Sequence, residues 1–282
     1  RDGVPAGVKG IAQTPDGFLW LGTNTGLYRF DGIRAEPFGA ELLPAGAITA
    51  LAITANGDLW AASSSTHVAR VTRGRMTVFE VPTPGQKSGA TFLAPDPDGT
   101  LWVATRDTVL NFDGQRWRVI KHPWPPASTW SQPGGVWGLA VARDGTVWTK
   151  NLLGLYYLRR GADTFQLASG YAGGVIDFAR DRNNRLWTAD FATQRLYALP
   201  DLPLEAVVPQ PEFGAAAPPT ILGTVILDRD GTLWNANRVA GGLHRVSSVV
   251  APGAPERFTL SQGLTSDLVT SVFEDREGNI WI

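Results

Sequence analysis

Seven copies of one short turn motif, each followed at once by tryptophan, constrain what this chain can fold into. Each copy reads Asp, Asn or Glu, then Gly or Asn, then any residue, then an apolar residue. The tryptophans that follow are Trp20, Trp60, Trp102, Trp148, Trp187, Trp234 and Trp281. Successive ones lie between 39 (187−148) and 47 (234−187) residues apart. A period near forty with strand-like flanks is typical of a β-propeller, in which each repeat forms one four-stranded blade.

The first repeat predicts how one blade is built. Apolar and small residues over 8–12, 19–23, 26–30 and 34–38 indicate four strands, with Asp-Gly turns after the first and the third. The motif tryptophan falls on the second strand, where a large aromatic side chain buries most area between neighbouring blades. Because a single blade cannot bury both of its faces, stacked blades are expected to form the core together.

We therefore expect an all-β, seven-bladed propeller with an incomplete seventh blade, folded as one domain over residues 1–282. The expected repeats cover about residues 8–45, 46–87, 88–134, 135–173, 174–220, 221–266 and, in part, 267–282. The last strands of the seventh repeat are missing after Trp281 and Ile282, so we interpret the chain as a piece of a longer protein.

Composition excludes several kinds of function. The chain has 25 Lys plus Arg against 26 Asp plus Glu, a net charge of −1, which argues against nucleic acid as the main partner. It has no cysteine, and therefore no disulfide, thiolate nucleophile or Cys-based zinc site. No uninterrupted apolar run is long enough to span a bilayer.

Two stretches resemble the two-component regulator propeller repeat. Residues 11–23 read IAQTPDGFLWLGT and residues 26–32 read GLYRFDG. Residues 260–282 read LSQGLTSDLVTSVFEDREGNIWI. The resemblance extends over the whole chain and is weaker in repeats two, four and five. Repeat two departs from it at residues 66–70, where the Gly-Leu of the third strand is missing.

The resemblance implies a function. Blades of this family form the extracytoplasmic, periplasmic sensor of a bacterial membrane receptor whose output is a histidine kinase or a diguanylate cyclase. The fragment itself is then expected to bind a small-molecule ligand, for which the family suggests a carbohydrate, and to have no catalysis of its own. A second propeller or a receptor dimer partner is the expected protein contact.

The inner strands give little support to an enzyme. Only Lys9 and Asp177 are ionisable there, and His67, His122 and His244 lie on different repeats. We expect no catalytic residue, no bound metal and no cofactor, because a lactonase-type site needs several carboxylates around one cation. Two rivals stay open, a propeller enzyme of the virginiamycin B lyase or lactonase type and a protein-protein interaction scaffold.

The Asp-x-Asp-Gly strings that begin at Asp96 and Asp228 faintly resemble calcium loops. A calcium loop needs further acidic ligands and a Glu downstream, and none follows at that spacing. We interpret both strings as hairpin turns.

A Pro- and Trp-rich insertion between repeats three and four marks the candidate ligand face. Trp124 and Trp130 lie in a loop that joins an outer strand to the next inner strand, and loops between second and third strands open on that face. The candidate residues are Trp124, Trp130, His122, Gln132, Asn24, Arg106, Asn151, Asp190, Asn237 and Arg238. The two indoles can stack on a ligand that the polar groups orient. The alternative is that both rings pack under their own loop.

Overall fold

The computed structural model describes residues 5–44, 46–83, 88–125, 134–168, 175–190, 195–199, 224–237, 241–247 and 255–282. Within these ranges, the side chains of residues 175, 176, 189, 190, 195–197 and 237 are outside the description. The chain divides into two compact units, Arg1–Val141 and Ala142–Ile282. The single domain expected over residues 1–282 stays a prediction.

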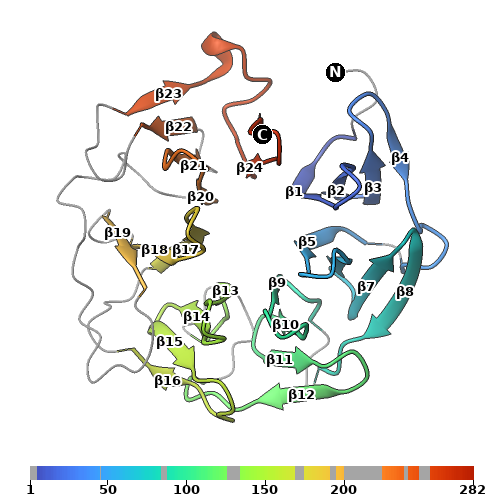
Figure 1. Ribbon diagram of the computed structural model, residues 1–282, viewed down its shortest axis with the longest axis vertical. Coiled ribbons are helices and arrows are strands. Elements are labelled where there is room, and N and C mark those ends of the chain that lie inside the picture. Colours follow the sequence, from blue (N-terminus) through green and yellow to red (C-terminus); the bar gives the residue numbers. More distant parts are fainter. Residues whose placement is uncertain are drawn as a thin grey trace. The chain divides into compact units, whose positions relative to one another are not determined.

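The first unit contains three sheets of four antiparallel strands, each in sequence order (Figure 1). The first sheet has β1 (Val8–Gln13), β2 (Leu19–Thr23), β3 (Gly26–Phe30) and β4 (Ala35–Pro37). The second has β5 (Ile48–Ile53), β6 (Leu59–Ser63), β7 (His67–Thr72) and β8 (Arg75–Glu80). The third has β9 (Phe92–Pro95), β10 (Leu101–Ala104), β11 (Val109–Phe112) and β12 (Trp117–Ile120), and strand β13 (Gly138–Val141) ends the unit.

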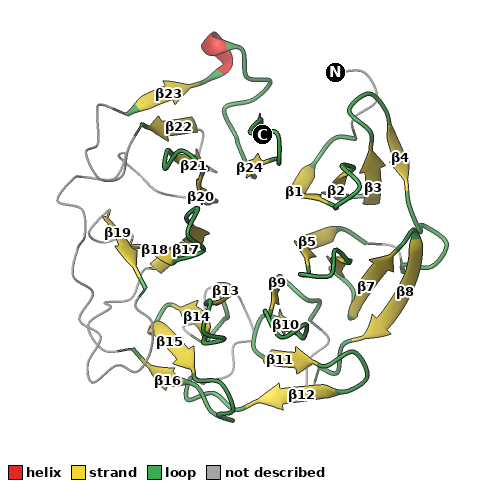
Figure 2. Ribbon diagram, in the orientation of Figure 1, coloured by secondary structure: helices red, strands yellow, loops and turns green. Residues whose placement is uncertain are grey.

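The second unit continues the same pattern of antiparallel neighbours. Its first strands are β14 (Val147–Asn151), β15 (Gly154–Leu158) and β16 (Gln166–Leu167), followed by the sheet of β17 (Val175–Arg180), β18 (Leu186–Asp190) and β19 (Arg195–Ala198). A four-stranded sheet has β20 (Val225–Leu227), β21 (Leu233–Asn237), β22 (Gly242–Val246) and β23 (Glu256–Phe258). The last sheet has β24 (Phe273–Glu274) and β25 (Ile280–Trp281). In the described part of the chain, the one helical element is the 3-10 helix η1 (Leu260–Gln262; Figure 2).

The all-β propeller expected from the repeats is confirmed, with one local correction. We expected an inner strand over residues 270–272, but β24 begins at Phe273. In the β24–β25 ladder, Phe273 lies opposite Trp281 and Glu274 opposite Ile280. The β24–β25 ladder therefore does not extend to residues 270 and 271, and the Thr270 carbonyl instead accepts the Thr224 hydroxyl at 3.4 Å.

All seven tryptophan motifs fold into the same backbone turn. The residue six before each tryptophan donates its N–H to the carbonyl two before the tryptophan, at 2.7 to 3.1 Å. Its own carbonyl accepts the N–H of the residue three before the tryptophan, at 2.8 to 3.1 Å. The residue three before the tryptophan has a positive φ, and it is glycine in six copies. In the remaining copy it is Asn184, with φ 62°. The seven copies are therefore equivalent in structure as well as in sequence.

The residue six before the tryptophan also binds the indole. In five motifs its side-chain oxygen accepts the indole Nε1–H. The pairs are Trp20–Thr14 (2.8 Å), Trp102–Asp96 (3.0 Å), Trp187–Asp181 (3.0 Å), Trp234–Asp228 (2.8 Å) and Trp281–Asp275 (2.7 Å). We call this contact the indole clamp. The interpretation of the Asp96 and Asp228 strings as hairpin turns is confirmed.

In the seventh motif, hydrogen-bond donors keep the clamp carboxylate of Asp275 ionised. Burial alone would raise the pKa of Asp275, but hydrogen bonds from Trp281 and Asn279 hold that pKa below its usual value. A charge-assisted bond to the indole is therefore available at neutral pH.

The motif tryptophans pack between neighbouring sheets, whether or not they are clamped. In the first unit, Trp20 packs in one buried cluster with Ile48 and Leu59 of the second sheet. Trp60 packs with Phe112 of the third sheet, their ring centroids 5.8 Å apart. In the second unit, Trp187 clusters with Val225 of the next sheet, and Trp234 packs against the cluster that holds Val272. These contacts confirm four of the motif tryptophans, Trp20, Trp60, Trp187 and Trp234, as core between sheets.

Trp60 and Trp148 are the two motif tryptophans without the clamp. The indole of Trp148 is fully buried, and its Nε1–H has no hydrogen-bond partner in the structure. The residue six before it is Ala142, which has no side-chain acceptor. We predict that Ala142→Thr supplies the acceptor, as Thr14 does for Trp20, and raises the free energy of unfolding by about 0.5–1.5 kcal/mol. Urea unfolding followed by tryptophan fluorescence measures the change.

The reciprocal variant is Asp96→Ala, which leaves the buried indole of Trp102 without its acceptor. We expect it to lower the free energy of unfolding by about 1–3 kcal/mol. If Asp96→Ala is neutral, or if Ala142→Thr destabilises the protein, the clamp does not contribute to stability as argued.

Candidate functional site

The insertion after β12 packs its first tryptophan inward. Trp124 is only 4% exposed, and its ring stacks on His122 with centroids 4.4 Å apart and planes 9° apart. His122 Nδ1 is 3.0 Å from the backbone carbonyl oxygen of Trp124. The hypothesis of an exposed Trp124 indole is therefore wrong, because His122 covers one face of the ring and burial hides the rest.

The structure does bring the insertion to the β10–β11 turn. The Val136 N–H donates to the Arg106 carbonyl oxygen at 2.6 Å, which fixes the end of the insertion on that turn. The next residue, Trp137, is 41% exposed. Trp137 is thus the exposed indole of this region in the described residues, and it carries no candidate role in the sequence analysis.

Of the other candidates in the first unit and the insertion, the structure describes Asn24 but not Trp130 or Gln132. Asn24 is exposed in the β2–β3 turn, with its Nδ2 packed so closely on Gly7 that a Cβ there would lie 2.4 Å away. Trp130 and Gln132 lie outside the described residues. No hydrogen bond in the described part of the chain joins Asn24 to Arg106.

In the second unit, Asn151 is buried, and its Oδ1 accepts the Leu153 N–H at 2.8 Å. Asn151 therefore shapes the β14–β15 turn. Asp190 and Asn237 are the last residues of β18 and β21, but their side chains are outside the description, as is Arg238 altogether. Binding by the ten candidates stays a prediction.

The ionisable residues of the inner strands are occupied or exposed. Asp177 on β17 accepts the N–H of Phe178 at 2.8 Å and the N–H of Val225 on β20 at 3.2 Å, so its carboxylate joins two neighbouring sheets. Lys9 on β1 is exposed. Among the residues that the structure describes, no group of three His, Cys, Asp or Glu side chains could hold a metal ion.

A buried histidine lies in the second unit. His244 on β22 is opposite Asn235 on β21, and both side chains are buried. His244 Nε2 is 2.9 Å from the Gly241 carbonyl oxygen, so Nε2 carries the proton of the neutral ring. Burial, with a smaller effect of the Arg257 charge, lowers the pKa of His244 below its usual 6.5.

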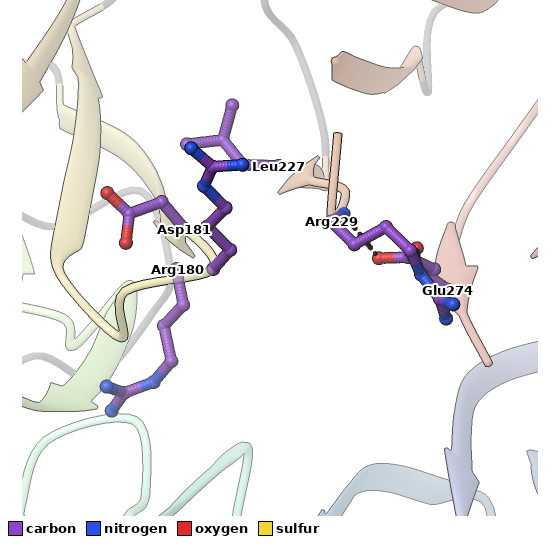
Figure 3. Close-up of a pocket in the computed structure, with 6 residues that line it drawn as sticks. Arg180, Asp181, Leu227, Arg229 and Glu274 are labelled. Carbon is purple, nitrogen blue, oxygen red and sulfur yellow. Dashed lines mark hydrogen bonds and ion pairs between the residues drawn. The ribbon is translucent and has the colours of Figure 1, made fainter. Parts of the chain in front are cut away.

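One cavity of about 490 Å³ opens in the second unit (Figure 3). It is lined by Arg180, Asp181, Arg182, Leu227, Arg229 and Glu274. These residues come from the ends of β17, β20 and β24 and from the turns that follow the first two strands. None of these residues is among the candidates from the sequence, because the turns that carry them were interpreted as hairpins without a binding role.

We predict different outcomes for the two indoles near the insertion. Trp124→Ala removes a buried ring and is expected to cost about 3–5 kcal/mol, as Trp60→Ala does. Trp137→Ala removes a partly exposed ring and is expected to cost about 1 kcal/mol. Melting temperatures of the three variants test this, and a Trp124→Ala protein as stable as Trp137→Ala would contradict the packing described.

We also predict a pH dependence from His244. Since its pKa is lowered in the folded state, the unfolded chain binds more protons just below pH 6.5, and stability is lost as the pH falls there. His244→Gln should remove that part of the dependence. Urea unfolding between pH 7.5 and 5.5 measures it, and identical slopes for both proteins would show that His244 titrates normally.

Comparison with known proteins gives two kinds of similar fold. The virginiamycin B lyase from Staphylococcus aureus superimposes on this chain with a TM-score of 0.73 and is 14% identical in sequence. The superposition covers 98% of this chain and 90% of the lyase chain. A catalytically inactive histidine-to-alanine variant of that lyase has been solved with quinupristin. No curated protein sequence matches the chain significantly.

The extracellular domains of two hybrid two-component systems from B. thetaiotaomicron are also similar. They give TM-scores of 0.72 and 0.70, each at 17% identity and with 99% of this chain covered. The chain spans 38% and 37% of their lengths. No helix in the described ranges is long and apolar enough to cross a membrane.

The family comparison agrees with the resemblance noted in the sequence. The two component regulator propeller family matches residues 263–282. This stretch contains β24, β25 and the seventh indole clamp. The chain is therefore an all-β propeller whose residues 263–282 match the two component regulator propeller family.

Proposed function

We propose that this chain is the ligand-sensing, extracytoplasmic propeller of a bacterial two-component-type signalling receptor, placed in the periplasm and without catalysis of its own. The observation that carries the proposal is the family match at residues 263–282. Fold similarity to the extracellular domains of hybrid two-component systems supports it.

We propose further that the seven tryptophan motifs mark seven blades of one propeller, the seventh of which is incomplete. The support is the equivalence of the seven turns, since each has the same two backbone hydrogen bonds. The two-stranded sheet of β24 and β25 is the seventh blade in this proposal.

An enzyme of the lyase type is the second candidate, because the lyase fold is as similar as the receptor domains. Two features favour the sensor. Asp177 is engaged in backbone hydrogen bonds between sheets. His244 is buried and its Nε2 lies within hydrogen-bond distance of the Gly241 carbonyl, so this ring is not arranged as a general base on a reacting group.

The proposed ligand is a small molecule, and a carbohydrate is the first class to test. The exposed Trp137 beside Arg106 offers a ring and a polar neighbour of the kind that small-molecule sites combine. The proposed protein partners are a second propeller or a receptor dimer partner. A pure interaction scaffold would need only these protein contacts.

A binding screen and an activity assay separate the three functions. The purified chain is heated with each member of an oligosaccharide panel, and a ligand present at about 100 times its Kd should stabilise the protein by roughly 2.7 kcal/mol. Trp137→Ala should reduce the rise in melting temperature that the ligand causes. Ile33→Ala, which removes an exposed apolar side chain from the β3–β4 turn, should leave that rise unchanged. Turnover of quinupristin by the chain would establish a lyase, and the absence of any stabilising ligand would favour the scaffold.

A further inference from the structure

The cavity of the second unit is lined mostly by charged side chains, three of them arginines. Figure 3 shows Arg180 and Asp181 on one side of the space, and Arg229 with Glu274 on the other. Leu227 is the one apolar residue that lines it. A cavity of this composition suits a charged group better than an apolar one.

Both carboxylates of the cavity are already hydrogen-bonded. Asp181 accepts the indole N–H of Trp187 at 3.0 Å and two backbone N–H groups of its own turn at 2.8 and 3.0 Å. Glu274 accepts from Arg229 Nε at 2.7 Å and from the Arg229 backbone N–H at 3.0 Å. These carboxylates therefore have little remaining capacity to hold a cation.

Arg229 is held in place at the edge of the cavity. Besides its ion pair with Glu274, its Nη2 donates to the backbone carbonyls of Asp275 and Arg276, each at 2.8 Å. A Cβ on Gly278 would lie 3.1 to 3.3 Å from the guanidinium, so glycine at this turn leaves space for it. A guanidinium fixed in this way is preorganised to donate to the oxygens of an oxyanion.

Arg182 and Arg180 lie on the opposite side. Arg182 is exposed, and no described carboxylate forms an ion pair with it. Arg180 donates to the Asn184 Oδ1 at 2.8 Å, and crowding by its neighbours lowers its pKa although the side chain as a whole is exposed. A bound anion would offset that desolvation of the charged guanidinium.

The sequence shows that this arrangement is particular to the second unit. The turn position just after the clamp residue holds Pro15, Ala55 and Pro97 in the three complete sheets of the first unit. In the second unit the same position holds Arg143, Arg182, Arg229 and Arg276. The repeat therefore places arginines at one register, and two of the four line the cavity.

We propose that this cavity binds the oxyanion group of a small ligand, a phosphate, sulfate or carboxylate, between Arg182 and Arg180 on one side and Arg229 on the other. Three arginines against two engaged carboxylates leave a net positive charge, and arginine forks match oxyanion geometry. This inference goes beyond the proposed function, because it holds whether the chain senses, catalyses or only binds.

Calorimetric titration of the 282-residue chain at low ionic strength tests the site. The probes are inorganic phosphate, sulfate and succinate, and saturable binding of at least one is expected with a Kd on the order of 1 mM. The probe that binds identifies which of the three oxyanions the site prefers. Arg182→Gln should weaken that binding about tenfold or more, because one charge-assisted hydrogen-bonding group is lost.

Arg143→Gln is the matched control, since it removes the same charge from the same turn position but outside the cavity. It should change the Kd by less than about twofold. Arg182→Lys retains the charge and should weaken binding less than Arg182→Gln, which a merely structural role would not produce. Both Arg182 variants should keep the wild-type melting temperature, because the side chain is exposed.

Two results would overturn the proposal. One is the absence of saturable binding of all three probes up to about 50 mM. The other is equal weakening by Arg182→Gln and Arg143→Gln, which would show attraction to net charge alone. Neither result bears on the sensing function, because an uncharged carbohydrate can bind elsewhere.

Discussion

The hydrogen bond from a tryptophan indole to the residue six positions before it is the contact that joins turn to core in five of the seven repeats. The turn between them brings the donor and acceptor together, and the backbone bonds of that turn are the same in all seven copies. The indole then packs between its own sheet and the next, as for Trp20 and Trp187. A buried indole N–H is costly without an acceptor. The clamp thus links local turn geometry to the packing of neighbouring sheets.

The sequence predicted the elements that this contact controls and missed those that depend on tertiary packing. The turn motif gave the propeller, the second strands and the buried tryptophans, and strand β7 (His67–Thr72) forms even without Gly-Leu at its start. Trp124 was proposed as an exposed ring, but its stacking on His122 depends on how the insertion folds back. The clamp acceptors at Asp181 and Asp275 could have been found from their constant spacing to tryptophan.

The same reasoning explains where function can vary on this fold. Turn side chains and insertions differ among repeats, whereas the backbone bonds of the tryptophan turns do not. Candidate sites therefore lie at Trp137, Arg106 and the arginine turns. Similar propellers include a lyase and receptor domains, so the fold alone does not decide between chemistry and sensing. The engaged carboxylate of Asp177 makes the inner strands a poor place for catalysis.

The proton chemical shifts of the indole Nε1–H groups test the clamp most directly. A hydrogen bond to a carboxylate draws electron density from the proton and moves its resonance downfield. In a two-dimensional proton–nitrogen spectrum assigned by single Trp→Phe variants, Trp102, Trp187, Trp234 and Trp281 should resonate downfield of Trp148, which has no acceptor. A Trp148 resonance among those of the other four would contradict the clamp as the feature that distinguishes them.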